Sequence, residues 1–156
     1  MHGVLRSPKH QVATSHPTPE EFKQLCLREF AFLTEQFGFS TEPLPTDEII
    51  NPVQVRFVSP TTRVRVEGRA WGESIWVSLE SLSGRWARLA DILAVRAPEL
   101  VTLFAQQGDQ RVLLQQAAIA MKENASDVLR GDFGLFDIVE THRQQLHQKL
   151  RDNEAT

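Results

Sequence analysis

The residues whose types and spacing could do chemistry lie in three alternating stretches between positions 53 and 80. There every second side chain is apolar and the others are polar or charged, a period of two that places each set on its own face of a β-sheet. Tryptophan and arginine are common at the centres of protein interfaces, and an exposed ring among arginines can also stack on a nucleobase. The residues that we expect on the outer face, and assign to partner binding, are Trp76, Arg56, Arg65, Glu67 and Arg63.

The other reactive side chains show no spacing that is typical of a catalytic or metal site. The chain has no GxGxxG, P-loop, paired CxxC or HExxH motif. His142 and His147 would lie about 140° apart around an ideal helix, so they would not share a face for one metal ion. Cys26 falls on the apolar side of a predicted helix, which favours a buried thiol over a nucleophile. We therefore expect no catalytic residue, metal ion or cofactor.

Composition narrows the class of protein. A length of 156 residues with 41% hydrophobic and 24% charged residues is typical of one globular domain. The net charge of −3 disfavours a general nucleic-acid binder, because such proteins usually carry a basic excess. The single cysteine cannot form an internal disulfide, which favours a reducing, cytoplasmic location. No apolar run approaches about 18 residues, so we expect no membrane-spanning helix.

Turn residues and the alternation together predict how the three strands pair. Corners at Pro60-Thr61 and Trp71-Gly72 indicate two antiparallel hairpins. A slip of one residue would exchange the apolar and charged faces, so the register is strongly specified. Arg56 then faces Arg65, an unfavourable pair of like charges unless Glu67 or an acidic partner relieves it. The predicted rows are Val55–Val66–Val77 and Phe57–Val64–Leu79 inside, and Arg56–Arg65–Ser78, Gln54–Glu67–Trp76 and Val58–Arg63–Glu80 outside.

Helical periodicity before and after these strands predicts a second layer. Thr18 and Glu21 can form a capping box, and Gly38 suits a left-handed C-terminal cap. We expect the proline-containing stretch 40–52 to be a linking loop. The predicted helices run from Pro19 to Phe37, from Trp86 to Arg96, from Pro98 through Leu103 and Phe104, from Asp109 to Arg130, and from about Phe136 to Leu150.

These elements predict an α+β fold, a three-stranded antiparallel meander (about 53–80) with an N-terminal helix and about four C-terminal helices packed on one face. We expect a single domain over 18–150, between a flexible N-terminal extension (1–17) and a flexible tail (151–156). The predicted core is Phe22, Phe30, Leu33, Phe37, Val55, Phe57, Val64, Val66, Val77, Leu79, Leu93, Leu114, Met121, Val139 and Leu146.

The order of these elements resembles a loose group of small bacterial α+β proteins, some of which look like immunity proteins of toxin–immunity systems. The resemblance covers about residues 19–148, and the long histidine-containing segment before Thr18 departs from it. It implies a single-domain protein that binds a protein partner rather than one that catalyses a reaction, and it assigns no binding residue. The residues that carry it are Glu29-Phe30-Ala31-Phe32-Leu33, Gly38-Phe39, Val55-Arg56-Phe57, Val64-Arg65-Val66 and Leu129-Arg130-Gly131-Asp132.

Three hypotheses of function stay open at this point. The first is a non-catalytic, cytoplasmic protein-binding module, immunity-like, that uses the outer sheet face. The alternative is a small enzyme or small-molecule binder with its site between the sheet and the helices. The third is a single-stranded nucleic-acid binder on the sheet face. A homodimer through the outer sheet face or the last helix is compatible with the sequence.

Overall fold

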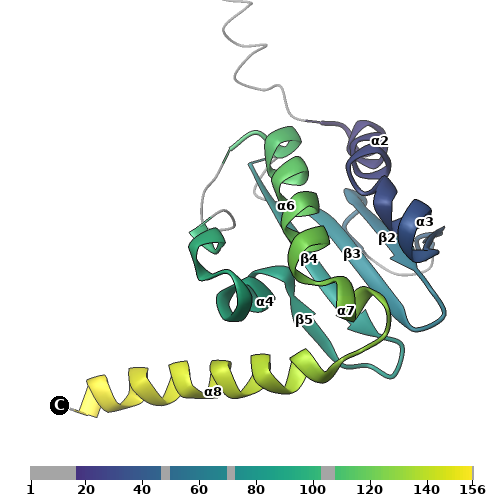
Figure 1. Ribbon diagram of the computed structural model, residues 1–156. Helices are drawn as coiled ribbons and strands as arrows, with labels where there is room; N and C mark the ends of the chain where they lie inside the picture. The colour runs from purple at the N-terminus through teal and green to yellow at the C-terminus, as the bar shows by residue number, and fades with distance from the viewer. Residues whose placement is uncertain (1–16, 47–49, 70–72, 103–107, 156) are drawn as a thin grey trace, which may run out of the picture.

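The computed structural model describes residues 17–46, 50–69, 73–102 and 108–155. It shows an α+β architecture, in which helices pack on one face of a five-stranded sheet (Figure 1). The strands follow chain order across the sheet, and each pairs antiparallel with the next. The strands are β1 (Ser40–Glu42), β2 (Gln54–Val58), β3 (Thr62–Arg69), β4 (Ser74–Ser81) and β5 (Trp86–Arg88).

The prediction of a three-stranded meander is therefore wrong, because two edge strands extend it. Both β1 and β5 have three residues, which is too few for an alternation to be recognised in a sequence. β1 lies in the stretch predicted as a loop. Trp86 and Arg88, predicted at the start of a helix, flank the buried Ala87 in β5, and the helix begins only at Leu89.

The predicted register of the three central strands is confirmed. Val66 pairs with both Val55 and Val77, and Arg65 pairs with Arg56. The inward-facing side chains of these rows are all buried, as one apolar sheet face under a helical layer requires. The predicted corner at Trp71-Gly72 lies outside the described residues.

The helical layer differs from the prediction mainly by two breaks. Phe30 and Ala125 each leave helical geometry and are fully buried, so the chain changes direction there while it keeps its apolar side on the sheet. The predicted capping box is confirmed, with the N–H of Glu21 donating to Thr18 Oγ1 at 3.2 Å. The helices are α2 (Pro19–Glu29), α3 (Ala31–Phe37), α4 (Leu89–Arg96), the 3₁₀ turn η2 (Pro98–Leu100), α6 (Gln110–Asn124), α7 (Ser126–Leu129) and α8 (Gly134–Ala155).

The helix predicted from Pro98 and the last predicted helix also differ from the structure. The helix predicted from Pro98 begins as a 3₁₀ turn over Pro98–Leu100, Thr102 is again helical, and Leu103 and Phe104 lie outside the described residues. α8 runs to Ala155, so residues 151–155 of the predicted tail are helical. Among the described residues, no helix combines the length and the apolarity needed to cross a membrane.

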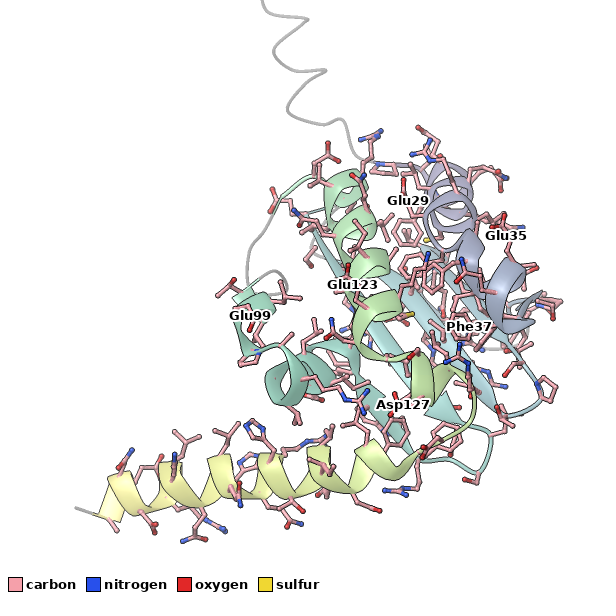
Figure 2. All side chains as sticks on the ribbon, in the orientation of Figure 1. Glu29, Glu35, Phe37, Glu99, Glu123 and Asp127 are labelled. Atoms are coloured by element: carbon pink, nitrogen blue, oxygen red, sulfur yellow. The ribbon has the colours of Figure 1, made fainter. Side chains whose placement is uncertain are left out.

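The core lies between the sheet and helices α2, α4 and α6, and side chains fill this space (Figure 2). Gly68 on β3 lets the side chains of Gln110 and Val53 pack close to the backbone of the strand. A Cβ at this position would lie 2.8 Å from both Gln110 Nε2 and Val53 Cγ1. The predicted core residues are buried with two exceptions. Phe37 is half-buried, and Leu146 is 48% exposed, because α8 has left the body of the protein before it reaches that residue.

Candidate interaction surface

The outer face of the sheet is the face that no described helix covers. Helices α2, α3, α6 and α7 all lie on the opposite side (Figure 1). Because side chains alternate, the paired register decides which residues share the outer face. The outer rows are Ser40–Val58–Arg63–Glu80–Trp86, Glu42–Arg56–Arg65–Ser78–Arg88, Gln54–Glu67–Trp76 and Arg69–Ser74.

Arg63 lies at the centre of the first row and is held by two carboxylates. Its Nε–H donates to Glu42 Oε2 at 2.7 Å, and its Nη1–H donates to Glu80 Oε1 at 2.7 Å. These hydrogen bonds, Glu42's first, raise the pKa of the Arg63 guanidinium. All three side chains are only about a quarter exposed, so this network joins strands β1, β3 and β4.

Trp76 lies between two arginines at the other end of the face. The guanidinium carbon of Arg69 is 4.5 Å from the ring centroid and that of Arg88 is 5.4 Å away. Both distances suit cation–π attraction. Glu67, opposite Trp76, is buried and accepts from Arg69 Nη2 at 2.7 Å. Arginine stems therefore cover part of the tryptophan, the intramolecular cover that competes with a partner for this ring.

Arg56 and Arg65 occupy the middle of the face and have no carboxylate partner among the described residues. Arg56 Nε–H donates to the amide oxygen of Gln54 at 3.1 Å. The buried Nε of Arg65 has no hydrogen-bond partner. The neighbouring carboxylates are engaged elsewhere, Glu42 and Glu80 by Arg63, Glu67 by Arg69 and Asp91 by Arg88. Glu67 thus gives no relief to the predicted like-charge pair, and both guanidinium groups are left without a carboxylate among the described residues.

Trp86 at the edge of the face was not predicted as a surface residue. It is 50% exposed and lies opposite Glu80 in the pairing of β4 with β5. Tryptophan is one of the residue types that are enriched at interface hot spots. Sequence reasoning missed Trp86, Arg88 and Glu42 for one reason, since all three belong to the three-residue strands. The sequence signal at residues 86–88 is one small apolar residue between a tryptophan and an arginine, which is too short to distinguish from the start of a helix.

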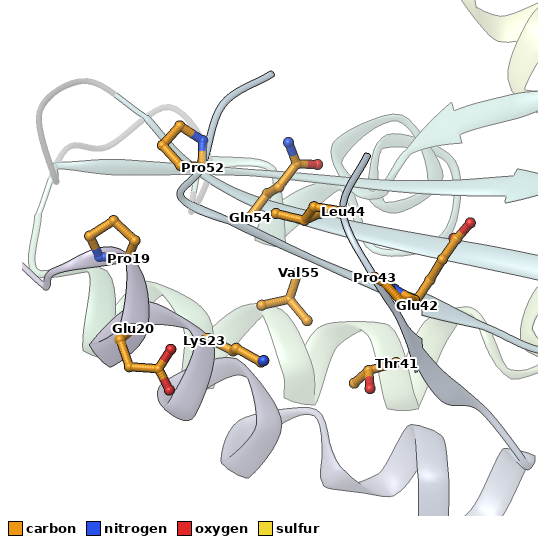
Figure 3. A pocket seen from close by; sticks show the side chains of 10 residues that line it. All are labelled: Pro19, Glu20, Lys23, Thr41, Glu42, Pro43, Leu44, Pro52, Gln54 and Val55. Carbon is orange, nitrogen blue, oxygen red and sulfur yellow. The ribbon is translucent and has the colours of Figure 1, made fainter. Parts of the chain in front are cut away.

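A second candidate site is a pocket of about 380 Å³ at the rim of the sheet. Figure 3 shows Glu20 and Lys23 on α2 facing Thr41 and Val55 on the strands. Its volume falls in the range of small-molecule sites, and its lining mixes prolines with charged and amide groups. The pocket is at the edge, whereas the middle of the interface between sheet and helices is filled with side chains.

The described residues offer little else for catalysis. Their His, Cys, Asp and Glu side chains form no group of three that could hold a metal ion. Burial strongly raises the pKa of the Cys26 thiol, so the thiolate that a nucleophile needs is disfavoured.

Comparison of the chain with protein-family models, with curated proteins and with solved structures found no match. The similarity to immunity-like proteins therefore stays a prediction. Function has to be inferred from the geometry of the two surfaces described above.

Proposed function

We propose that this protein is a non-catalytic, cytoplasmic protein-binding module that receives an acidic surface of its partner on the outer sheet face. The observation that carries the proposal is the cross-strand pair Arg56–Arg65, which has no carboxylate partner among the described residues. Two adjacent arginines repel each other in the free protein, and this cost is removed when carboxylates of a partner approach them.

The rest of the face supports a protein as the partner. The arginine pair is flanked by Trp76, with its two arginines, and by the half-exposed Trp86. Tryptophan and arginine are the residue types that are enriched at interface hot spots. Arg63 and Glu67 are already paired within the chain, so their contribution is to hold the face in shape. The resemblance to immunity-like proteins favours a partner that this protein neutralises.

The test compares what the tagged protein captures from a nuclease-treated lysate of its native organism. We expect one stoichiometric protein with the unmodified chain, and at least about a tenfold loss with Arg56→Gln/Arg65→Gln. Arg28→Gln is the control for loss of an arginine elsewhere on the surface, because Arg28 is exposed and lies on α2, on the other side of the sheet. Nuclease treatment removes capture through nucleic acid, the third hypothesis.

Two results would contradict the proposal. One is an equal yield of the same partner from the double variant and the control. The other is a partner that purifies with the protein but protects β1 or α2, and not β3 and β4, from amide hydrogen exchange. Equal thermal unfolding of all variants has to accompany the comparison, so that loss of binding is not loss of fold.

A small-molecule binder is the second candidate, and the rim pocket is the observation in its favour. Lys23 would be its cation, which favours an acidic ligand such as a carboxylate. A thermal-shift screen of small organic acids tests this, with Lys23→Gln against Lys122→Gln as the control on α6. A ligand that raises the unfolding temperature of the native chain and of Lys122→Gln, but not of Lys23→Gln, would support the pocket; equal shifts would exclude Lys23 as its anchor.

A further inference from the structure

The last helix, α8, continues well past the part of the protein that it packs against. Its buried residues, Leu135, Phe136 and Val139, all lie in the first two turns. Every residue over 144–155 is exposed. Figure 1 shows this second half extending away from the sheet and the other helices to the C-terminal end, and Figure 2 shows its side chains with no other element beside them.

The apolar face of α8 does not stop where its own contacts stop. Leu146 is 48% exposed and Leu150 is 60% exposed. At about 100° per residue, both lie within about 40° of the direction of the buried Val139. The face that α8 turns towards its own body therefore carries two uncovered leucines along the projecting half.

A projecting helix of this length is not expected to be stable by itself. The exposed segment has about three turns, and in proteins most helical stability comes from packing of an apolar face, which this segment lacks. Apolar residues on its inner face gain stability only when another surface covers them. The projecting half of α8 thus has the features of a segment that is packed in an assembly.

Next to these leucines, α4 and α8 form a hollow that could receive a helix. One part, about 480 Å³, is lined by Ala94 and Val95 of α4 and by Ile138 and His142 of α8. A second part of about 330 Å³ continues along α8 past His142 to Leu146 and beyond. Ile138 is 55% exposed in this hollow. The projecting half thus carries two uncovered leucines and, beside them, an open hollow that runs on from His142.

We infer that this apolar face is covered by the α8 helix of a second copy, packed antiparallel so that the two projecting halves lie along each other. Pairing about a two-fold axis near Gln148 sets Leu146 of each copy against Leu150 of the other. It also brings Arg143 of each copy close to Glu154 of the other. Because a two-fold interface is reciprocal, this contact forms two times.

The charges of α8 favour this arrangement over an unrelated helix. Arg143 donates a long hydrogen bond to Asp91 at 3.4 Å, a carboxylate that Arg88 also holds, and lies 3.8 Å from Glu140. Glu154 is exposed and has no ion pair among the described residues. Antiparallel pairing brings this arginine and this glutamate close together on the same flank of the leucines, where Glu154 has no ion pair among the described residues and Arg143 shares its nearest carboxylate with Arg88.

The contact spans about four turns of each helix, which is at the small end for a specific protein interface. We therefore expect a dissociation constant on the order of 10 µM rather than an obligate dimer. This dimer uses neither the outer sheet face nor the rim pocket, so it stands or falls independently of the proposed function.

Sedimentation velocity of the full chain tests the inference. We expect a monomer–dimer equilibrium whose dissociation constant rises at least about tenfold in Leu146→Lys and in Leu150→Lys. Gln144→Lys is the control, since Gln144 is exposed and lies about 160° around the helix from Leu146. A native chain that stays monomeric up to about 200 µM, or leucine variants that dimerise as the control does, would overturn the inference.

A charge exchange then tests the antiparallel register. Glu154→Arg and Arg143→Glu should each weaken the dimer, and the double variant should restore affinity to within about threefold of the native chain, because the pair is rebuilt with reversed polarity. Thermal unfolding checks Arg143→Glu, which also loses its contact with Asp91. If Glu154→Arg leaves the affinity unchanged, or the double variant is as weak as the single ones, the antiparallel arrangement is wrong.

Discussion

Arg63 on β3 holds Glu42 on β1 across the whole width of β2. Its Nε–H donates to Glu42 Oε2 at 2.7 Å, and its Nη2–H donates to Oε1 at 3.2 Å. The remaining Nη1–H donates to Glu80 on β4 at 2.7 Å. β1 has only three residues, so this two-pronged contact supplies a large part of what fixes the edge of the sheet.

Replacing Arg63 should therefore affect the sheet more than it affects a partner. We expect Arg63→Gln to lower the free energy of unfolding by about 1 kcal/mol, since the network is only partly screened by solvent. The amide hydrogens of β1 should exchange faster, while those of β3 and β4 change less. Urea unfolding and hydrogen exchange measure this. Arg56→Gln is the control, and an equal loss in both variants would contradict a special role for Arg63.

The ion pair between Arg96 and Asp127 predicts a dependence of stability on pH. Arg96 ends α4 and donates to both carboxylate oxygens of Asp127, at 2.7 Å and 2.6 Å, near the junction of α6 and α7 (Figure 2). Its hydrogen bonds lower the pKa of Asp127 from the ordinary value of 3.8. The folded protein thus holds this carboxylate ionised more strongly than the unfolded chain does.

A lowered folded-state pKa stabilises the protein above pH 3.8, and this contribution is lost as the pH falls through the folded value. Asp127→Asn removes the contribution at every pH. We expect the native chain to exceed Asp127→Asn by about 1 kcal/mol near neutral pH, with the difference shrinking towards about pH 2. Urea unfolding over this range measures it. A difference that stays constant with pH would show that Asp127 acts through packing alone.

The central part of the sheet was predictable because its signal is long and constrained on both sides. A one-residue slip would bury Arg65 and expose Val64, so only one register fits the two corners. The breaks at Phe30 and Ala125 were not predictable, because each lies inside an unbroken apolar periodicity. The exposure of Leu146 was hidden in the same way, since periodicity shows which face is apolar but not where the neighbouring surface ends.

Part of the outer sheet face was predictable from the strand register. The rows that place Arg56 against Arg65 and Glu67 against Trp76 follow from the register alone. The same register places Glu80 beside Arg63, which is one of the two carboxylates that hold it. It does not give Glu42, the second carboxylate, or Arg88, the second arginine at Trp76, because these two residues belong to the edge strands β1 and β5.

Gly131 should tolerate no side chain, although it lies at the surface end of α7. Its φ is +94°, and a Cβ there would lie 2.8 Å from Thr61 Oγ1 in the β2–β3 turn. We expect Gly131→Ala to lower the free energy of unfolding by about 2 kcal/mol, through backbone strain and this clash. Gly108→Ala is the control, because a Cβ at Gly108 meets nothing within 4 Å. Equal unfolding free energies of the two variants would contradict the close packing of this turn.

The unpaired arginines should matter for binding and not for folding. Arg65 faces Arg56, and its buried Nε lacks a hydrogen-bond partner, so Arg65→Gln removes repulsion and an unsatisfied donor. We expect its free energy of unfolding to equal or exceed that of the native chain by up to about 0.5 kcal/mol. Ser78→Ala, at the neighbouring position in the same row, controls for a general change of this face. Urea unfolding at low and high salt measures both, and added salt should narrow the gap between the native chain and Arg65→Gln because it screens the like charges. If Arg65→Gln instead lowers the free energy of unfolding by more than about 1 kcal/mol, Arg65 stabilises the sheet. That result would contradict a role for this arginine in binding alone.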